Sequence, residues 1–151
     1  MPSAPLLFAG ETVSQIPRGV ATLLPLVLPM FLERIEAGFP SPAADYMECG
    51  LDANEYLVAN KAASFYLEVS GYSMVNAGIL DGDKVLIDRS IEPTHNCIVV
   101  AVLNNKFTLK RLYMQNGVIE LRPENPAYQP IRLQEGDELI AWPVVGLLRK
   151  M

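Results

Sequence analysis

Short segments of alternating apolar and polar residues, separated by Gly and Asn turn residues, fill the chain from Ser64 onward. Successive side chains of a β-strand point to opposite faces, so this two-residue period predicts strands rather than helices. Asp81-Gly82 and Asn116-Gly117 are typical of turns between antiparallel strands. Strands are expected at residues 65–69, 84–88, 97–103, 106–114, 118–121 and 138–148. Pro143 in the last segment favours an edge strand or a bulge. The pattern predicts a mainly β fold, a partly closed barrel of short antiparallel strands.

One helix signal and an apolar arm precede these strands. Asp52 and Glu55 have the spacing of a helix capping box, which predicts one short helix that ends near Asn60. Residues 20–36 are largely apolar but are divided by prolines, which favours extended pieces over a single helix. A free arm of this composition would aggregate, so we expect it to pack on its own domain or on a second subunit. Phe39-Pro40-Ser41-Pro42 then predicts a stiff, extended linker.

Length and charge narrow the functional classes. A chain of 151 residues, half of them apolar, is long enough for one domain with its own core. The net charge of −5 disfavours extensive binding to phosphate groups, which needs clustered Lys and Arg. Cys49 and Cys97 lie in no metal-ligand or disulfide pattern, which favours a reduced, cytoplasmic protein. The apolar stretch at residues 20–32 is shorter than the roughly 20 residues that a membrane-spanning helix needs. We therefore expect no membrane association.

Ser73 and Lys110 are the candidate catalytic pair. Gly71 can adopt backbone angles closed to other residues, so the chain can turn sharply just before Ser73. A serine hydroxyl becomes a nucleophile when a base takes its proton, and a lysine can serve if burial lowers its pKa. The backbone amides of Ser73 and Met74 could then face a developing oxyanion. The residue types alone also fit a plainer interpretation, with Ser73 as a turn residue and Lys110 as a solvated strand residue.

Other polar residues offer weaker candidates. Lys84 and Lys106 are alternative bases, but Lys106 opens a strand and is expected to be solvated, whereas Lys110 lies mid-strand among apolar residues. His95 is the single histidine and has no neighbouring carboxylate motif to orient it, so it is interpreted as a surface loop residue. One histidine and two unclustered cysteines cannot form a zinc site. Three acidic residues fit turn chemistry better than a cation site: Asp81, Asp83 and Asp88. We therefore expect neither a metal nor a cofactor.

Several motifs, in a fixed order, resemble the self-cleaving serine peptidase domain of LexA and UmuD. They are Ser-Gly-Tyr-Ser-Met at residues 70–74, the segment 77–83 and Phe-Thr-Leu-Lys at 107–110. Residues 37–46 resemble the cleavage-site region of UmuD, and residues 125–131 are also UmuD-like. The resemblance implies that Ser73 is the nucleophile and Lys110 its base. Tyr72 stands where the family commonly has Asp, which leaves the cleavage rate open.

The resemblance also implies that the substrate is the chain's own arm, cut between Ala37 and Gly38. Both residues are small, as close approach of a backbone to a hydroxyl demands. In an extended substrate Ile35 points the same way as Ala37 and can fill an apolar pocket. Cys49-Gly50 is a competing bond, because UmuD cuts between Cys and Gly. The implied organisation is an arm at residues 1–37 removed by cleavage, a linker and short helix at 38–63, and a β peptidase domain at 64–151.

A protein of this kind would act in the bacterial SOS response to DNA damage. The resemblance implies a homodimer whose cleavage is promoted by the RecA nucleoprotein filament, and a product that serves a Y-family, UmuC-like translesion polymerase. The 37 residues before the bond leave little room for a helix-turn-helix domain, so direct sequence-specific DNA binding is not expected. The alternatives are a LexA-like transcriptional repressor and a non-catalytic β interaction module. Membrane-bound signal peptidases use a related Ser-Lys dyad, but the chain shows no anchor for that class.

Overall fold

The computed structural model describes residues 24–32, 34–38 and 48–151. It divides into two compact units. The first, here called the sheet unit, comprises residues 60–151, and the second, the hairpin unit, holds the described residues up to Ala59. The predicted linker at residues 39–42 lies outside the described residues.

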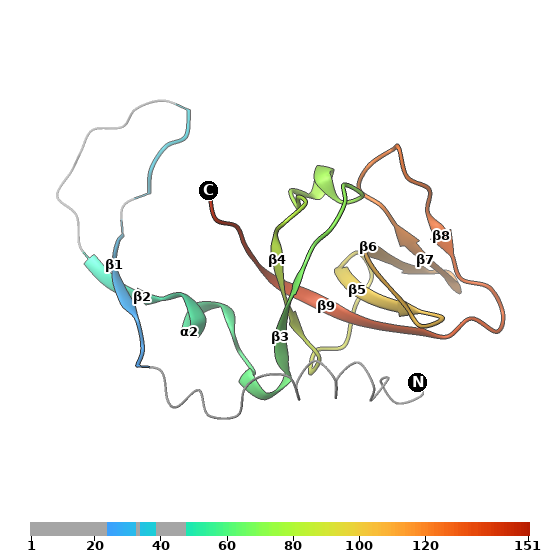
Figure 1. The fold of residues 1–151 in the computed structure, drawn as a ribbon, viewed down its shortest axis with the longest axis horizontal. Helices are drawn as coiled ribbons and strands as arrows, with labels where there is room; N and C mark the ends of the chain where they lie inside the picture. The colour runs from blue at the N-terminus through green and yellow to red at the C-terminus, as the bar shows by residue number, and fades with distance from the viewer. Residues whose placement is uncertain (1–23, 33, 39–47) are drawn as a thin grey trace. The chain divides into compact units, whose positions relative to one another are not determined.

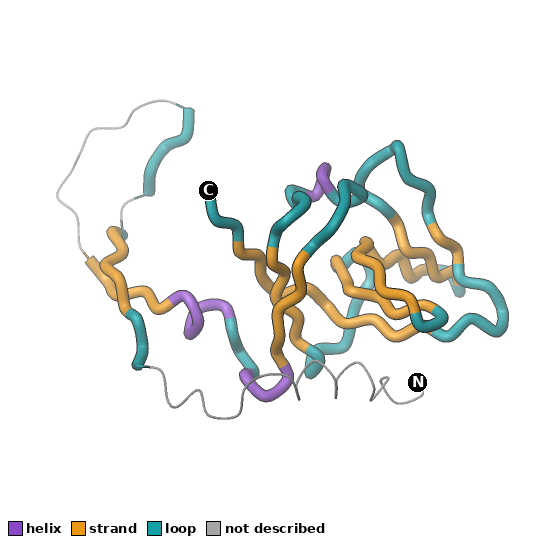
Figure 2. The backbone as a smooth tube through the Cα atoms, viewed as in Figure 1, coloured by secondary structure: helices purple, strands orange, loops and turns teal. Residues whose placement is uncertain are grey.

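A single seven-stranded antiparallel sheet dominates the sheet unit (Figure 1), in the order β3-β4-β9-β5-β6-β7-β8. The strands are β3 (Ser64–Glu68), β4 (Lys84–Asp88), β5 (Ile98–Leu103), β6 (Lys106–Gln115), β7 (Val118–Arg122), β8 (Ile131–Arg132) and β9 (Leu139–Leu148). The described helical pieces are short (Figure 2), and the two in this unit are the 3-10 turns η1 (Lys61–Ala63) and η2 (Val75–Ala77). The prediction of a mainly β fold is therefore confirmed.

β5 forms the centre of the core because both of its faces are buried. On one face Val100 and Val102 pack with Phe65 and Trp142, whose rings meet edge to face at 5.9 Å between centroids. On the other face Val99 and Ala101 pack with a second apolar group contributed by Leu112, Leu121 and Ala141. A strand buried on both sides reads as a continuous apolar run, which is what residues 98–103 show.

β9 passes from one part of the sheet to the other, and Pro143 marks the change. Leu139 to Pro143 pair with β5, whereas Val144 to Leu148 pair with β4. The register with β4 shifts between Leu86 and Ile87, which is the bulge that the proline suggested. The alternative expectation of an edge strand is wrong, since β9 lies inside the sheet. Proline donates no backbone hydrogen bond, and the junction between two ladders tolerates that loss.

The sheet does not close into a barrel. Among the described residues, β3 and β8 are its two ends and do not pair with each other. The short β8, Ile131–Arg132, was not expected from the sequence. Two residues carry no readable alternation, and the strand forms only because β7 offers it a free edge at Glu120 and Leu121.

In the hairpin unit, β1 (Val27–Phe31) pairs antiparallel with β2 (Glu48–Asp52), and α2 (Ala53–Leu57) follows directly. β1 confirms the expectation of extended structure in the apolar arm. Asp52 caps α2, because its carboxylate accepts hydrogen bonds from the amides of Asn54 and Glu55 at 2.9 and 3.2 Å. The helix ends at Leu57 rather than near Asn60, since Val58 already has extended backbone angles.

Candidate active site

The turn that carries Ser73 follows β3 and is held by the segment before β4. Val69 makes two backbone hydrogen bonds with this segment. Its amide donates to the Asp83 carbonyl oxygen, and its carbonyl oxygen accepts from the Gly82 amide, each at 2.8 Å. Gly71 has a φ of +99°, an angle that L-residues rarely adopt, and its amide donates to the Asp81 carboxylate at 2.7 Å. The buried side chain of Met74 anchors the far end of the turn in the core. Ser73 is thereby fixed at the surface of the unit, partly exposed.

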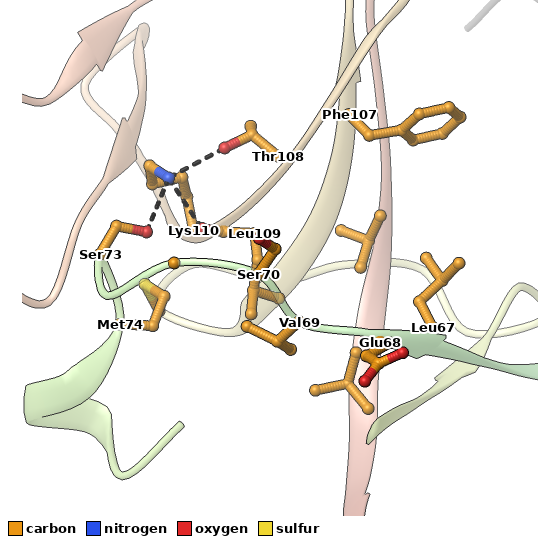
Figure 3. A pocket seen from close by; sticks show the side chains of 13 residues that line it. Leu67, Glu68, Val69, Ser70, Ser73, Met74, Phe107, Thr108, Leu109 and Lys110 are labelled. Atoms are coloured by element: carbon orange, nitrogen blue, oxygen red, sulfur yellow. Dashed lines mark hydrogen bonds between the residues drawn. The ribbon is translucent and has the colours of Figure 1, made fainter. Parts of the chain in front are cut away.

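Lys110 reaches Ser73 from the middle of β6. Its Nζ lies 3.0 Å from Ser73 Oγ, 2.9 Å from Thr108 Oγ1 and 3.0 Å from the Leu109 carbonyl oxygen (Figure 3). The side chain is buried, 9% exposed, although it belongs to the most strongly hydrated class of residue. Three polar partners around one buried nitrogen satisfy it in either protonation state.

Burial lowers the pKa of Lys110 from its ordinary value, because a charged ammonium loses hydration there. Among the described residues, none of the ion pairs includes Lys110, so no carboxylate opposes this effect by direct contact. A neutral amine has two N–H groups and one lone pair. It can donate to Leu109 and Thr108 and accept from the Ser73 hydroxyl. This is the arrangement a general base requires.

The competing candidates occupy other places. Lys84 is exposed and pairs with Glu68 at 3.2 Å, and Lys106 is exposed at the start of β6. His95 Nδ1 accepts a hydrogen bond from the Met114 amide at 3.0 Å, and its ring stacks edge-on against a tyrosine. The structure therefore gives the histidine a role in holding a loop on β6. Among the described residues, no group of three or more His, Cys, Asp or Glu side chains could hold a metal ion.

The three acidic residues considered for a cation site bind protein groups instead. Asp81 accepts from the Gly71 amide, and Asp88 accepts from the amide and hydroxyl of Ser90. Asp83 is buried and bound by the Arg149 guanidinium, which holds the pKa of that carboxyl at about 2. Each carboxylate thus fixes a turn or the C-terminal segment.

A cleft of about 280 Å³ runs beside the Ser73–Lys110 pair. It is lined by residues 67–71, 73–74 and 107–110, together with Val85 and Val100. Ser70 also lines the cleft, but Lys110 bonds Ser73 and not Ser70. Glu68 and Phe107 stand at the end of the cleft away from Lys110 (Figure 3). The cleft combines an apolar wall with the hydroxyls of Ser70, Ser73 and Thr108 and the amine of Lys110.

The bond singled out by the sequence, Ala37-Gly38, lies in the hairpin unit. Both residues are exposed and sit at a bend in the loop between β1 and β2. Ile35 is 95% exposed. The competing bond, Cys49-Gly50, lies inside β2, where Cys49 pairs with Met30 and Gly50 with Pro29. A peptide bond in a paired strand is less available to a peptidase than one in an exposed loop.

Comparison with known proteins settles the family. Residues 29–145 match the Peptidase S24-like family. The chain belongs to this family. Protein ImpA of Salmonella typhimurium is 46% identical over 105 residues, 70% of this chain and 67% of ImpA. Protein SamA of the same species is 43% identical over 107 residues, 71% of this chain and 76% of SamA. The LexA repressor of Bordetella pertussis is 41% identical over 128 residues, 84% of this chain but 58% of the repressor. The resemblance to the LexA and UmuD self-cleaving serine peptidases is thus confirmed.

The residues predicted for the site from the sequence did not include Thr108. Thr108 lies two residues before Lys110 on the same face of β6, and its hydroxyl contacts Nζ. The alternation of the strand predicts that Thr108 and Lys110 share one face, but the sequence alone assigned Thr108 no role. No helix among the described residues is long and apolar enough to cross a bilayer.

Proposed function

We propose that this protein is a self-cleaving serine peptidase in which Ser73 is the nucleophile and Lys110 the general base. One observation carries the proposal: a buried lysine whose Nζ lies 3.0 Å from the hydroxyl oxygen of a serine at a glycine-hinged turn. Burial lowers the lysine pKa and so raises the fraction of neutral amine near neutral pH. The family match supports peptidase chemistry.

Neutral Lys110 takes the Ser73 hydroxyl proton as Oγ attacks the scissile carbonyl carbon. The amides of Ser73 and Met74 donate hydrogen bonds to the carbonyl oxygen and stabilise the negative charge that develops on it. The ammonium of Lys110 then gives its proton to the leaving amine, and an acyl–Ser73 intermediate remains. A water molecule, deprotonated by the same lysine, then attacks the ester carbonyl, and Lys110 returns the proton to Ser73 Oγ as the acyl group leaves. Thr108 and the Leu109 carbonyl oxygen hold Nζ in place throughout these proton transfers.

The substrate is the Ala37-Gly38 bond of the protein's own arm. Its place in an exposed loop leaves its backbone free to enter a cleft, and both neighbouring side chains are minimal. A side chain at Gly38 would meet nothing within 4 Å, so the glycine is not required by local packing. Its small size is instead suited to close contact with a nucleophile. Ile35, which is almost fully exposed, supplies an apolar anchor for the wall of the cleft.

The biological setting is the SOS response to DNA damage. In this proposal the chain forms a homodimer in the bacterial cytoplasm, and the RecA nucleoprotein filament promotes the cut. The trimmed product serves a UmuC-like translesion polymerase. The support is the similarity to ImpA and SamA, together with Protein MucA of Escherichia coli, 47% identical over 88 residues, 58% of this chain and 60% of MucA.

Intact-mass measurement tests the proposal. The protein is incubated with RecA, nucleotide and single-stranded DNA, with Ser73→Ala as the matched control. Cleavage at Ala37-Gly38 leaves residues 38–151, whereas cleavage at Cys49-Gly50 leaves residues 50–151. We expect the longer product from the wild type and the uncut chain from Ser73→Ala. An uncut wild-type chain after prolonged incubation would favour a non-catalytic β module.

A LexA-like repressor is the second candidate, because the Bordetella pertussis repressor aligns with 84% of this chain. That function needs sequence-specific DNA contacts, which would bring clustered basic residues and a recognition helix. Specific retardation of a DNA fragment by the uncut protein, lost on cleavage, would favour the repressor.

A further inference from the structure

The loop that follows β7 holds the Ser73 turn by its backbone. The Glu124 amide donates to the Ser73 carbonyl oxygen at 2.8 Å, and the Asn76 amide donates to the Glu124 carbonyl oxygen at 2.9 Å. The side-chain amide of Asn125 donates to the Tyr72 carbonyl oxygen at 2.9 Å. Two successive carbonyl groups of the nucleophile turn are therefore bound by one neighbouring loop.

These bonds orient the two amides expected to bind the oxyanion. A trans peptide group is planar, and its C=O and N–H point in opposite directions. The Tyr72 carbonyl shares its plane with the Ser73 amide, and the Ser73 carbonyl shares its plane with the Met74 amide. Binding both carbonyl oxygens on the side of the loop directs both N–H groups to the other side. Such fixed donors stabilise developing charge without reorganising during the reaction.

Asn125 is itself held in one orientation. Its Nδ2 faces the Tyr72 carbonyl oxygen, and its Oδ1 accepts from the Ala127 amide at 3.0 Å. A flipped side chain would set a donor against that amide and an acceptor against that carbonyl oxygen, so both bonds would be lost. The side chain therefore links its own loop to the nucleophile turn, and it can transmit the loop's position to the peptide plane of Ser73.

The loop is anchored to the strand that carries the base. The Arg111 Nε contacts the Glu124 carboxylate, and its Nη1 donates to the Asn96 carbonyl oxygen at 2.6 Å. Arg111 directly follows Lys110 in β6, so the two side chains point to opposite faces of the strand. One strand thus presents Lys110 to Ser73 on one face and fixes the loop behind the turn on the other.

We propose that Asn125 is a positioning residue for the oxyanion site, acting through the Tyr72–Ser73 peptide group, with Arg111 and Glu124 fixing the loop. The inference rests on the proposed function, because it concerns the same cleavage reaction. It assigns Asn125 no contact with Lys110, whose partners are Ser73, Thr108 and Leu109. Loss of its donor should therefore slow the chemical step without changing the titration of the base.

Two substitutions distinguish the hydrogen bond that Asn125 donates to Tyr72 from the one that it accepts within its own loop. Asn125→Asp keeps an oxygen to accept from the Ala127 amide but loses the donor to Tyr72, whereas the uncharged Asn125→Ala loses both contacts. Asn116→Asp makes the same change of charge at the exposed β6–β7 turn and serves as the control. The first-order rate of self-cleavage is measured from neutral to alkaline pH without activator, and thermal unfolding is recorded for each variant.

We expect both Asn125 variants to lower the plateau rate by about tenfold or more, since loss of an oxyanion donor itself costs 10²- to 10³-fold. The pH midpoint of Asn125→Ala and the plateau of Asn116→Asp should match the wild type. A wild-type plateau for Asn125→Asp would overturn the inference, even if Asn125→Ala unfolds. A shifted midpoint in Asn125→Ala would also overturn it, because the base would then be disturbed. If the wild type shows no cleavage that depends on Ser73, the proposed function itself is overturned.

Discussion

Both units of this chain contain paired β-strands, but the strands differ in how far they are buried. In the sheet unit, β5 is buried on both faces and gathers two apolar groups around it. In the hairpin unit, every residue of β1 is exposed, including Val27, Leu28 and Phe31. A two-stranded hairpin is only marginally stable alone in water, whereas a sheet of seven strands supplies its own core.

This contrast matches the roles proposed for the two units. A base and a nucleophile must be held within hydrogen-bond reach. In the sheet unit, Lys110 Nζ lies within hydrogen-bond distance of Ser73 Oγ and is held by Thr108 and the Leu109 carbonyl oxygen. A scissile bond must instead present free backbone, and Ala37-Gly38 lies in an exposed loop. In the proposed reaction, the sheet unit holds the dyad and the exposed loop supplies the bond that is cut. The following predictions test this division.

The largest effect is expected from removal of either member of the dyad. Ser73→Ala and Lys110→Ala should each abolish cleavage, and the double variant should be no slower, since nucleophile and base act as one unit. Lys110→Arg should be equally inactive, because arginine does not give up its proton at accessible pH. Cleavage is followed by intact mass, and far-ultraviolet circular dichroism checks the fold. Wild-type cleavage by Lys110→Ala would exclude the dyad.

Bulk at the scissile bond should block cleavage while the dyad stays intact. Ala37→Trp and Gly38→Val each enlarge a side chain that must pass close to Ser73 Oγ. Cys49→Trp is the matched control in the paired strand β2. We expect the two loop variants to remain uncut at alkaline pH and the control to be cut after Ala37. A product beginning at Gly50 would assign the cleavage to the other bond.

Core and hairpin substitutions should differ in their effect on stability. Ile87 is fully buried, and Ile87→Ala should lower the free energy of unfolding by about 2–5 kcal/mol through lost contacts and the cavity left behind. Leu28 is 59% exposed, and Leu28→Ala should change it by less than about 0.5 kcal/mol. Urea unfolding in a Ser73→Ala background gives both values. An equal cost at Leu28 would show that β1 packs against a partner, such as a second subunit.

Local patterns in the sequence predicted the strands better than their assembly. Two-residue alternation marked most of the strands of the sheet unit, and Asn116-Gly117 marked the turn between β6 and β7. The transfer of β9 from β5 to β4 at Pro143 could not be predicted, because it depends on which strands meet in space. The open sheet and the two-residue β8 depend on long-range pairing in the same way.

The residues of the candidate site also differ in how far the sequence could predict them. Ser73 and Lys110 lie 37 positions apart, and the structure places Lys110 Nζ 3.0 Å from Ser73 Oγ. The residue types alone made them candidates beside a plainer interpretation, and resemblance to a family favoured the pair. Thr108 was readable from strand alternation once Lys110 was chosen. Asn125 was not, since its bond to the Tyr72 carbonyl oxygen joins a loop to a turn 53 residues away. Backbone partners of a site leave no periodic trace in sequence.

The next prediction concerns the pH dependence of cleavage. Among the described residues, the sheet unit alone buries charged side chains, and Lys110 is the one cation among them. Burial lowers the pKa of Lys110. While the pH is below that pKa, the fraction of neutral Lys110 rises about tenfold for each unit of increasing pH, and above that pKa the fraction levels off. We expect unactivated cleavage to follow this curve. A rate unchanged between neutral pH and about pH 10 would argue against lysine as the base.

The same lowered pKa should appear in stability. Between the pKa of folded Lys110 and its ordinary value in the unfolded chain, the unfolded state binds more protons. The free energy of unfolding therefore rises with pH through this window, and the lysine destabilises the fold below it. In a Ser73→Ala background, Lys110→Met should remove this increment, and the difference between the two proteins cancels the titration of every other lysine and tyrosine. Urea unfolding at several pH values measures that difference. If it does not change with pH, Lys110 keeps its ordinary pKa and has no reason to be neutral beside Ser73.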